Sequence, residues 1–212
     1  MIAAGDSFTY GEELNDIQQA WPCLVAKKLD LSIINLGAPG GSNARSIRLL
    51  LEQDITDVAL VCIGWSHYDR IEVCDEVGIF DTWPGGYRKK FREEAPWRSQ
   101  LIDYISRHHN DDYLYQQYLF NIILIQSWLK SNQIPYVMMD AFGNHKDTRR
   151  WSSRFQPLMQ QIDKTHFIGW PDQSMIEWTV HTPQGWGHFL DEGHRIVADK
   201  ILDHLFQLNY RP

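Results

Sequence analysis

The sequence predicts an α/β protein of three layers, with about five parallel strands between two layers of helices. Short apolar segments alternate along the chain with segments whose apolar residues recur at helical spacing. The apolar segment in residues 57–64 is continuous, which is typical of a strand buried on both faces of a parallel sheet. Strands that alternate with helices indicate βαβ units with right-handed crossovers.

The first third of the chain supplies three strands and two helices. Pro22 falls in the first turn of its helix, where proline is tolerated, and Asn43 can cap the helix that follows. The second strand is rich in β-branched residues. We expect strands in residues 1–5, 31–37 and 57–64, and helices in residues 20–29 and 43–53.

Residues 71–112 interrupt this alternation. They contain proline, glycine, charged and aromatic residues without a sustained period, so we interpret them as an insertion in a single domain that spans residues 1–212. After the insertion comes the longest clean helical pattern of the chain. The expected elements are helices in residues 113–130 and 194–208, and strands in residues 134–142 and 165–170.

Composition narrows the classes of function. Of the 212 residues, 43% are hydrophobic and 22% are charged, as in an ordinary soluble domain. The net charge of -7 argues against nucleic acid or an anionic membrane as the main partner. Without a signal peptide or an apolar run of roughly 20 residues, a cytoplasmic location is expected, and a virion-associated one is left open. The oligomeric state is unknown from sequence, and three cysteines without CxxC spacing suggest neither disulfides nor zinc.

The loops that follow the strands carry the candidate chemistry, because the crevice of such a sheet lies at the carboxyl ends of its strands. Ser7 follows the first strand at the start of a helix, where backbone N–H groups can stabilise an oxyanion. The alternative is that Asp6-Ser7 is only a helix cap. The glycines of residues 35–43 allow close approach of backbone to ligand, or form a flexible turn.

The stretch "GDSFTYG" of residues 5–11 resembles the first block of the SGNH/GDSL hydrolases, a family of serine esterases and related acyl hydrolases. Three later stretches resemble the other family blocks in the right order: residues 35–40, 64–67 and 188–198. The resemblance implies a flavodoxin-like fold with strand order 2-1-3-4-5. It also implies a reaction that needs no cofactor.

In this resemblance Ser7 matches the nucleophile, and the backbone N–H groups of Ser7 and Gly40 match two oxyanion donors. The third block of the family usually reads Gly-x-Asn-Asp, whereas this chain reads Gly64-Trp65-Ser66-His67. Ser66 therefore stands where the oxyanion asparagine belongs. A hydroxyl can donate one hydrogen bond, and loss of one oxyanion donor costs on the order of 100- to 1000-fold in rate.

The last block contains two histidines. His188 matches the catalytic base, which lies on the loop before the final helix, and His194 matches a second histidine inside that helix. The other register, with Asp191 and His194 as the working pair, makes His194 the runner-up base. Three residues before His188 stands Gly185, where the family usually has Asp. The candidates for the acid are therefore Asp172, Glu177 and Asp191; a Ser-His dyad is also chemically reasonable.

The expected activity is hydrolysis of a carboxylic ester of a small molecule, or of an O-acyl group on a carbohydrate, through an acyl-enzyme. The nine tryptophans suit either loop packing or a surface that stacks on a sugar. The altered third block and the missing Asp motivate an alternative: a degenerate hydrolase that binds a glycan or another small ligand. A metal site on His188, Asp191 and His194 is disfavoured, because two of the three would lie awkwardly on a helix.

Overall fold

A sheet of five parallel strands forms the centre of the computed structural model, which describes residues 1–76, 78–84, 86, 96–144 and 153–211. Every neighbouring pair in the sheet is parallel. The strands run in the order β2-β1-β3-β6-β7, which is the expected order 2-1-3-4-5 once the two strands outside this sheet are set aside. Their bounds are Ile34–Asn35 (β2), Ile2–Gly5 (β1), Val61–Trp65 (β3), Tyr136–Asp140 (β6) and Phe167–Ile168 (β7).

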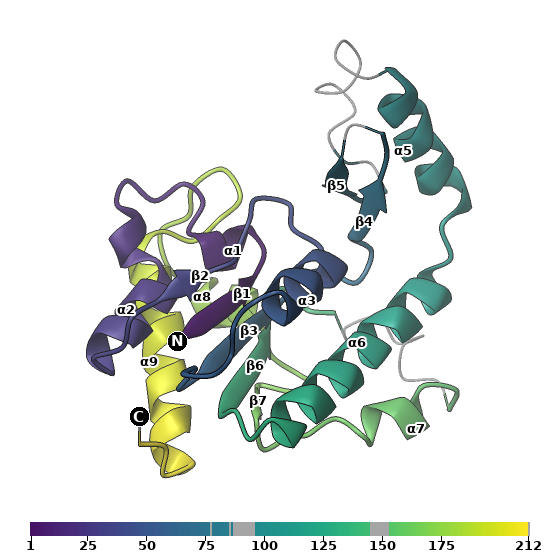
Figure 1. The fold of residues 1–212 in the computed structure, drawn as a ribbon. Coiled ribbons are helices and arrows are strands. Elements are labelled where there is room, and N and C mark those ends of the chain that lie inside the picture. The colour runs from purple at the N-terminus through teal and green to yellow at the C-terminus, as the bar shows by residue number, and fades with distance from the viewer. Residues whose placement is uncertain (77, 85, 87–95, 145–152, 212) are drawn as a thin grey trace.

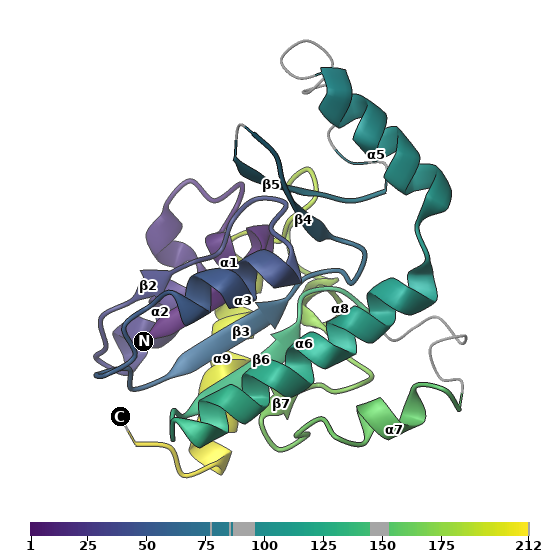
Figure 2. The same cartoon turned by 45° about the vertical axis from the view of Figure 1, so that its right-hand side comes forward.

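Helices cover both faces of the sheet, which confirms the three-layer α/β/α class (Figures 1 and 2). One face carries α2 and α9, and the other carries α3 and α6. The bounds of these four are Trp21–Lys28 (α2), Asp191–Gln207 (α9), Asn43–Leu51 (α3) and Asp111–Ser131 (α6). The other helices are α1 (Ser7–Tyr10), η1 (a 3-10 helix, Ile17–Gln19), α5 (Pro96–His108), α7 (Gln156–Met159) and α8 (Met175–Thr179).

The core follows from the two-residue period of the strands. Alternate residues of β3 point to opposite faces: Val61 and Ile63 pack with α6, whereas Cys62 packs with α2 and α9. All five residues of β3 and all five of β6 are buried. The continuous apolar pattern of these strands thus reflects helices on both faces.

The edge strands are shorter than the sequence predicts. Only Ile34–Asn35 pairs as β2 within the expected strand 31–37. The Asn35 side chain explains the end of this strand, because its Oδ1 accepts the N–H of Gly37 at 3.0 Å and its Nδ2 donates to the carbonyl of Thr9 at 3.0 Å. This Asx turn carries the chain out of the sheet and toward the end of β1.

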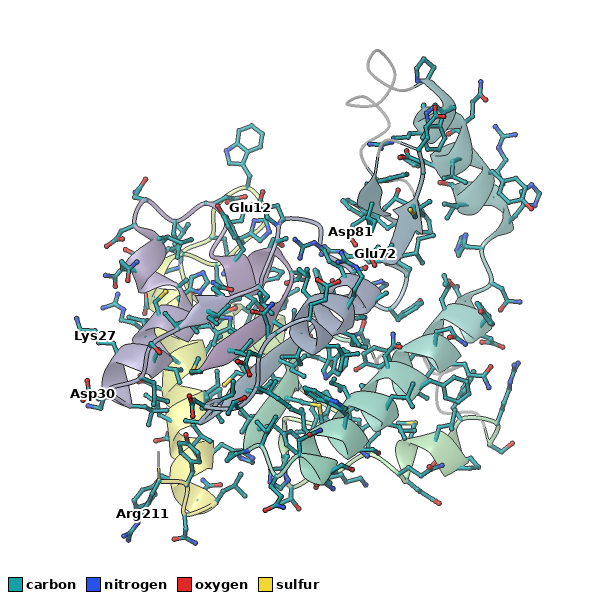
Figure 3. All side chains as sticks on the ribbon, viewed as in Figure 1. Glu12, Lys27, Asp30, Glu72, Asp81 and Arg211 are labelled. Atoms are coloured by element: carbon teal, nitrogen blue, oxygen red, sulfur yellow. The ribbon has the colours of Figure 1, made fainter. Side chains whose placement is uncertain are left out.

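The segment expected as an insertion begins with an antiparallel hairpin, β4 (Ile71–Cys74) and β5 (Ile79–Thr82), and continues into α5. These elements project beyond the sheet and its helices (Figures 1 and 2). Two ion pairs hold the root of the hairpin to α3: Arg48 Nη2 lies 2.7 Å from Glu72 Oε1, and Arg45 Nε lies 3.5 Å from Asp81 Oδ2. Figure 3 shows Glu72 and Asp81 beside α3 at this root. Regular structure here was not predicted.

Candidate active site

Ser7 lies at the turn between β1 and α1, at the carboxyl edge of the sheet. Asp6 caps α1, because its Oδ1 accepts the N–H of Phe8 at 3.0 Å. Gly5 makes the turn possible: a Cβ there would collide with the Thr9 hydroxyl and with the carbonyl of Gly64. The helix-cap alternative therefore holds for Asp6, while the neighbouring Ser7 side chain, 2% exposed, makes no hydrogen bond within the described residues.

The Asp6 carboxylate is fully buried and accepts three hydrogen bonds. Besides the N–H of Phe8, Ser66 Oγ donates to its Oδ2 at 2.9 Å and Arg70 Nη1 donates at 3.1 Å. Burial raises the pKa of Asp6, against the lowering effects of Arg70, the Ser66 and Phe8 hydrogen bonds, and the charge of His188. His188 is thus close enough in space to affect Asp6, although the two residues are far apart in the sequence.

Ser66 does not present its hydroxyl to an oxyanion in this structure. A hydroxyl has one hydrogen to donate, and that of Ser66 goes to Asp6. The oxyanion role expected for Ser66 from the third block stays a prediction, while in this structure its hydroxyl helps to hold the Asp6 turn.

Two asparagines that sequence reasoning missed fix the backbone of Ser66. Asn43 accepts the Ser66 N–H at 2.8 Å through Oδ1 and donates to the Ser66 carbonyl at 3.1 Å through Nδ2. Asn144 Nδ2 donates to the same carbonyl at 3.1 Å and to Asp140 Oδ1 at 3.0 Å. Asn43 had been expected only as a helix cap. The cap of α3 is Ser42, whose Oγ accepts the N–H of Arg45 at 3.1 Å.

The glycine-rich loop after β2 lies against the Ser7 turn. The N–H of Ala38 donates to the carbonyl of Gly5 at 3.3 Å, and a Cβ at Gly41 would lie 3.6 Å from the Cα of Asp6. Gly40 is in the left-handed region with φ 71. Its N–H donates no hydrogen bond within the described residues, and its role as an oxyanion donor stays a prediction.

His188 stands beside α1, between two carboxylates from the opposite end of the sequence. Its ring centroid lies 4.9 Å from that of Phe8. Its Nδ1 lies 2.9 Å from Glu13 Oε1, and its Nε2 lies 3.5 Å from Glu12 Oε2. Since a carboxylate only accepts, the hydrogen on Nδ1 is donated to Glu13. No hydrogen bond joins the Ser7 hydroxyl to His188 in the described structure.

His194 is placed differently. It is completely buried, and its Nδ1 accepts the backbone N–H of Trp21 at 3.1 Å, so it fixes α9 to the start of α2. Burial, followed by the charge of His188, lowers the pKa of His194 to about 3. The runner-up base therefore faces the protein interior as a neutral ring.

The carboxylates that contact His188 are those of Glu12 and Glu13, and none of the three acids expected from sequence takes this place. Glu177 instead caps α8 in a capping box with Ser174, where its Oε2 accepts the Ser174 N–H at 2.7 Å. Asp191 is the first residue of α9, and Asp172 lies in the turn after β7. The described residues contain no cluster of three His, Cys, Asp or Glu side chains that could hold a metal.

A small cleft adjoins Phe8 on the same edge. Its volume is about 260 Å³, and it is lined by Phe8, Ile176, Thr179, Val180, Gln184 and Gly187. Trp186, beside Gly187, is wholly exposed at 102% of its reference surface. Phe8 thus contacts both this cleft and the His188 ring, and Trp186 precedes His188 by two residues. None of the described helices has both the length and the apolar character that a membrane span requires.

Solved structures with a similar fold include members of the lipolytic G-D-S-L family and esterases. A member of the lipolytic protein G-D-S-L family from Veillonella parvula DSM 2008 matches with a TM-score of 0.51 at 14% identity, over 95% of both chains. The psychrotrophic esterase EstA from Pseudoalteromonas sp. matches with a TM-score of 0.55 at 12% identity, over 98% of this chain and 96% of that one. At such identities the likeness defines the class of fold, an SGNH-type α/β/α domain.

A third similar structure is a two-domain esterase active on acetylated mannans, with a TM-score of 0.55 at 12% identity. The match covers all of this chain and 49% of that chain, so this chain spans about half of its length. The chain belongs to DUF6071, a family of unknown function whose model matches residues 11–211. No curated protein matches the sequence.

Proposed function

We propose that this protein is a serine hydrolase that cleaves carboxylic esters, with Ser7 as nucleophile and His188 as general base. One observation carries the proposal above the others: His188, 181 positions after Ser7, stands against Phe8 with its Nδ1 hydrogen-bonded to a carboxylate. A ring held at Nδ1 leaves Nε2 as the atom that can take a proton.

The proposed reaction runs through an acyl-enzyme. Ser7 Oγ attacks the acyl carbonyl carbon while His188 Nε2 takes the hydroxyl proton. The N–H groups of Ser7 and Gly40 stabilise the tetrahedral oxyanion. The alcohol leaves with the proton from Nε2. Water, deprotonated by the same nitrogen, then attacks the acyl carbon, and the acid leaves as the bond to Ser7 Oγ breaks and this oxygen takes the proton back from Nε2. The Ser7–His188 hydrogen bond must form on the way, as such bonds often do only with substrate bound.

The substrate class that we propose is an O-acylated carbohydrate. Support comes from Trp186, whose exposed indole offers a face for a sugar ring beside the cleft at Phe8. The two-domain esterase of similar fold, which acts on acetylated mannans, adds support at the level of the fold.

The test is hydrolysis of p-nitrophenyl acetate together with labelling by a fluorophosphonate. Ser7→Ala and His188→Asn should each lower kcat by about 10⁴-fold or more, and Ser7→Ala should abolish labelling. Ser46→Ala is the matched control, because Ser46 is a buried serine that donates only to the carbonyl of Ser42 at 3.1 Å. Turnover that persists in a folded Ser7→Ala variant would exclude the proposal.

A second candidate is a binding module that keeps the pocket without catalysis. The observations that favour it are the donation of the Ser66 hydroxyl to Asp6 and the lack of a Ser7–His188 hydrogen bond in the described structure. This candidate requires that fluorophosphonate does not label Ser7 while acetylated oligosaccharides bind measurably by calorimetry. Labelling of Ser7 would rule it out.

A further inference from the structure

We propose that Glu13 is the positioning carboxylate of His188, supplied by the loop after α1 in place of an acid at residue 185. The inference rests on the proposed function, since it assigns a role in that same reaction. It concerns a residue that no block of the resemblance contains. Three independent features of the structure support it: the contacts of Glu13, the missing side chain at Gly185 and the backbone conformation at Glu13.

Glu13 uses both carboxylate oxygens to hold the histidine loop. Its Oε1 accepts from His188 Nδ1 at 2.9 Å, and its Oε2 accepts the backbone N–H of Trp186 at 2.6 Å. The side chains of Glu13 and His188 are 25% and 17% exposed. One carboxylate thus fixes both the ring and the backbone two residues before it, which restricts the rotation of the imidazole.

Gly185 provides the space for this carboxylate. A Cβ at residue 185 would collide with Glu13 Oε2. Gly185 is not among the glycines with positive φ, so its backbone would accept a side chain if Glu13 were absent. The turn is closed by the N–H of Gly185, which donates to the carbonyl of His188 at 2.8 Å. The lack of a side chain at residue 185 thus leaves the room that the Glu13 carboxylate occupies beside the histidine loop.

The backbone at Glu13 is unusual for a residue with a side chain. Its φ is 71, in the left-handed region, two residues after Gly11 with φ 90. Such a conformation is uncommon outside glycine and persists where the surroundings hold it. Here the contacts of the Glu13 carboxylate with Trp186 and His188 stabilise this backbone conformation. The loop after α1 is thus shaped to deliver this side chain.

The chemistry of the contact suits an orienting acid. Although burial opposes it, the hydrogen bond from His188 and that from the N–H of Trp186 lower the pKa of Glu13, so the carboxylate is ionised where the imidazole must act as base. An ionised carboxylate at Nδ1 selects the tautomer with a free Nε2 and stabilises the imidazolium formed during attack. Glu12 lies 3.5 Å from Nε2, on the side of the ring that must take the Ser7 proton.

The test is a carboxylate transplant, measured with p-nitrophenyl acetate. Glu13→Ala should lower kcat by about 10²- to 10⁴-fold with little change in KM. The double variant Glu13→Ala with Gly185→Asp should recover at least about tenfold of that loss, because the new side chain enters the space that the glutamate vacated. Gly185→Asp alone should lose activity through the collision, and the control Asp172→Asn should match the wild type.

A second readout separates this inference from the proposed function. Glu13→Gln should change the NMR signal of the His188 Nδ1–H proton, because a neutral amide replaces the carboxylate that accepts it at 2.9 Å, whether or not the protein hydrolyses esters. An inactive wild type with that change present would exclude the hydrolase and keep the Glu13–His188 pair. Glu13→Ala with wild-type kcat and an unchanged Nδ1–H signal would overturn the inference itself.

Discussion

The hydroxyl of Ser66 donates to Asp6 Oδ2 at 2.9 Å across the carboxyl ends of β3 and β1. Both side chains are completely buried. This contact takes the only hydrogen of the Ser66 hydroxyl and helps to compensate the burial of a carboxylate next to the proposed nucleophile. The contact gives the Ser66 hydroxyl a part in the Asp6 turn, whereas the resemblance implies a part in oxyanion binding.

Ser66→Ala should therefore reduce the stability of the protein more than its catalytic rate. Loss of one donor to the buried Asp6 carboxylate should reduce the free energy of unfolding by about 1–3 kcal/mol, while kcat of the folded fraction stays within about threefold. Urea unfolding and initial rates measure the two effects. A drop of about 100-fold or more in kcat with unchanged stability would instead make Ser66 an oxyanion donor.

His194 should make the protein sensitive to acid. Its pKa in the folded state is lowered by burial to about 3 from 6.5, so the unfolded chain takes up a proton below about pH 6.5 that the folded chain refuses. The free energy of unfolding should then fall as the pH drops from 6.5 toward 3, with a slope of about 1.4 kcal/mol per pH unit from this group.

His194→Asn checks this slope, because the asparagine Oδ1 can accept the Trp21 N–H in place of the ring nitrogen. The variant should start less stable at neutral pH but lose less stability on acidification, as followed by urea unfolding between pH 7 and pH 4. His181→Asn, at an exposed histidine, should leave the wild-type slope. An equal slope in both variants would contradict the assignment to His194.

The ion pair between Arg48 and Glu72 should contribute more to stability than the pair that Arg48 forms with Glu52 at the end of α3, because only the first joins α3 to the hairpin. Arg48 also pairs with Glu52 at 3.2 Å, but Glu52 is 55% exposed and Glu72 is 14% exposed. Glu72→Gln should thus destabilise by about 1 kcal/mol and speed hydrogen exchange in β4 and β5, whereas Glu52→Gln should cost less than about 0.5 kcal/mol. Equal exchange in the two variants would refute this.

Trp186 should contribute to substrate binding and hardly to folding. Its indole is wholly exposed, so Trp186→Ala should leave the melting temperature within about 1 °C, as expected for surface positions. If the indole stacks on a sugar, KM for acetylated oligosaccharides should rise severalfold while KM for p-nitrophenyl acetate stays the same. A parallel rise in both would argue against a role in sugar recognition.

The sheet was predictable because its evidence is local. The alternation of continuous apolar segments with helical patterns predicted a parallel sheet, and the resemblance supplied the strand order. β3 (Val61–Trp65) overlaps the expected strand 57–64, and β6 (Tyr136–Asp140) lies within the expected strand 134–142. The hairpin at residues 71–82 was not predicted. Its two strands have four residues each and lie outside the core, where the alternation of apolar and polar residues is weak. The boundaries of β2 depended on one Asn35 side chain, which no period reveals.

Only some residues of the candidate site could be predicted from the sequence. Ser7, Gly40 and His188 follow strands or precede a helix at recognisable positions, so a pattern could nominate them. Glu13 could not be found in this way, because its contact with His188 joins residues 175 apart in the chain. The adjacent Glu12-Glu13 pair, directly after the first block, was the one available signal. The direction of the Ser66 hydroxyl likewise depends on a neighbour 60 residues away.

The order in which a ribosome makes the parts of this site follows from the contact between Glu13 and His188. Glu13 and the proposed nucleophile are synthesised early, whereas the imidazole follows 175 residues after Glu13. Until His188 has been made, the proposed nucleophile has no base. The proposed chemistry can begin only once the loop that carries His188 has left the ribosome and packed against Phe8.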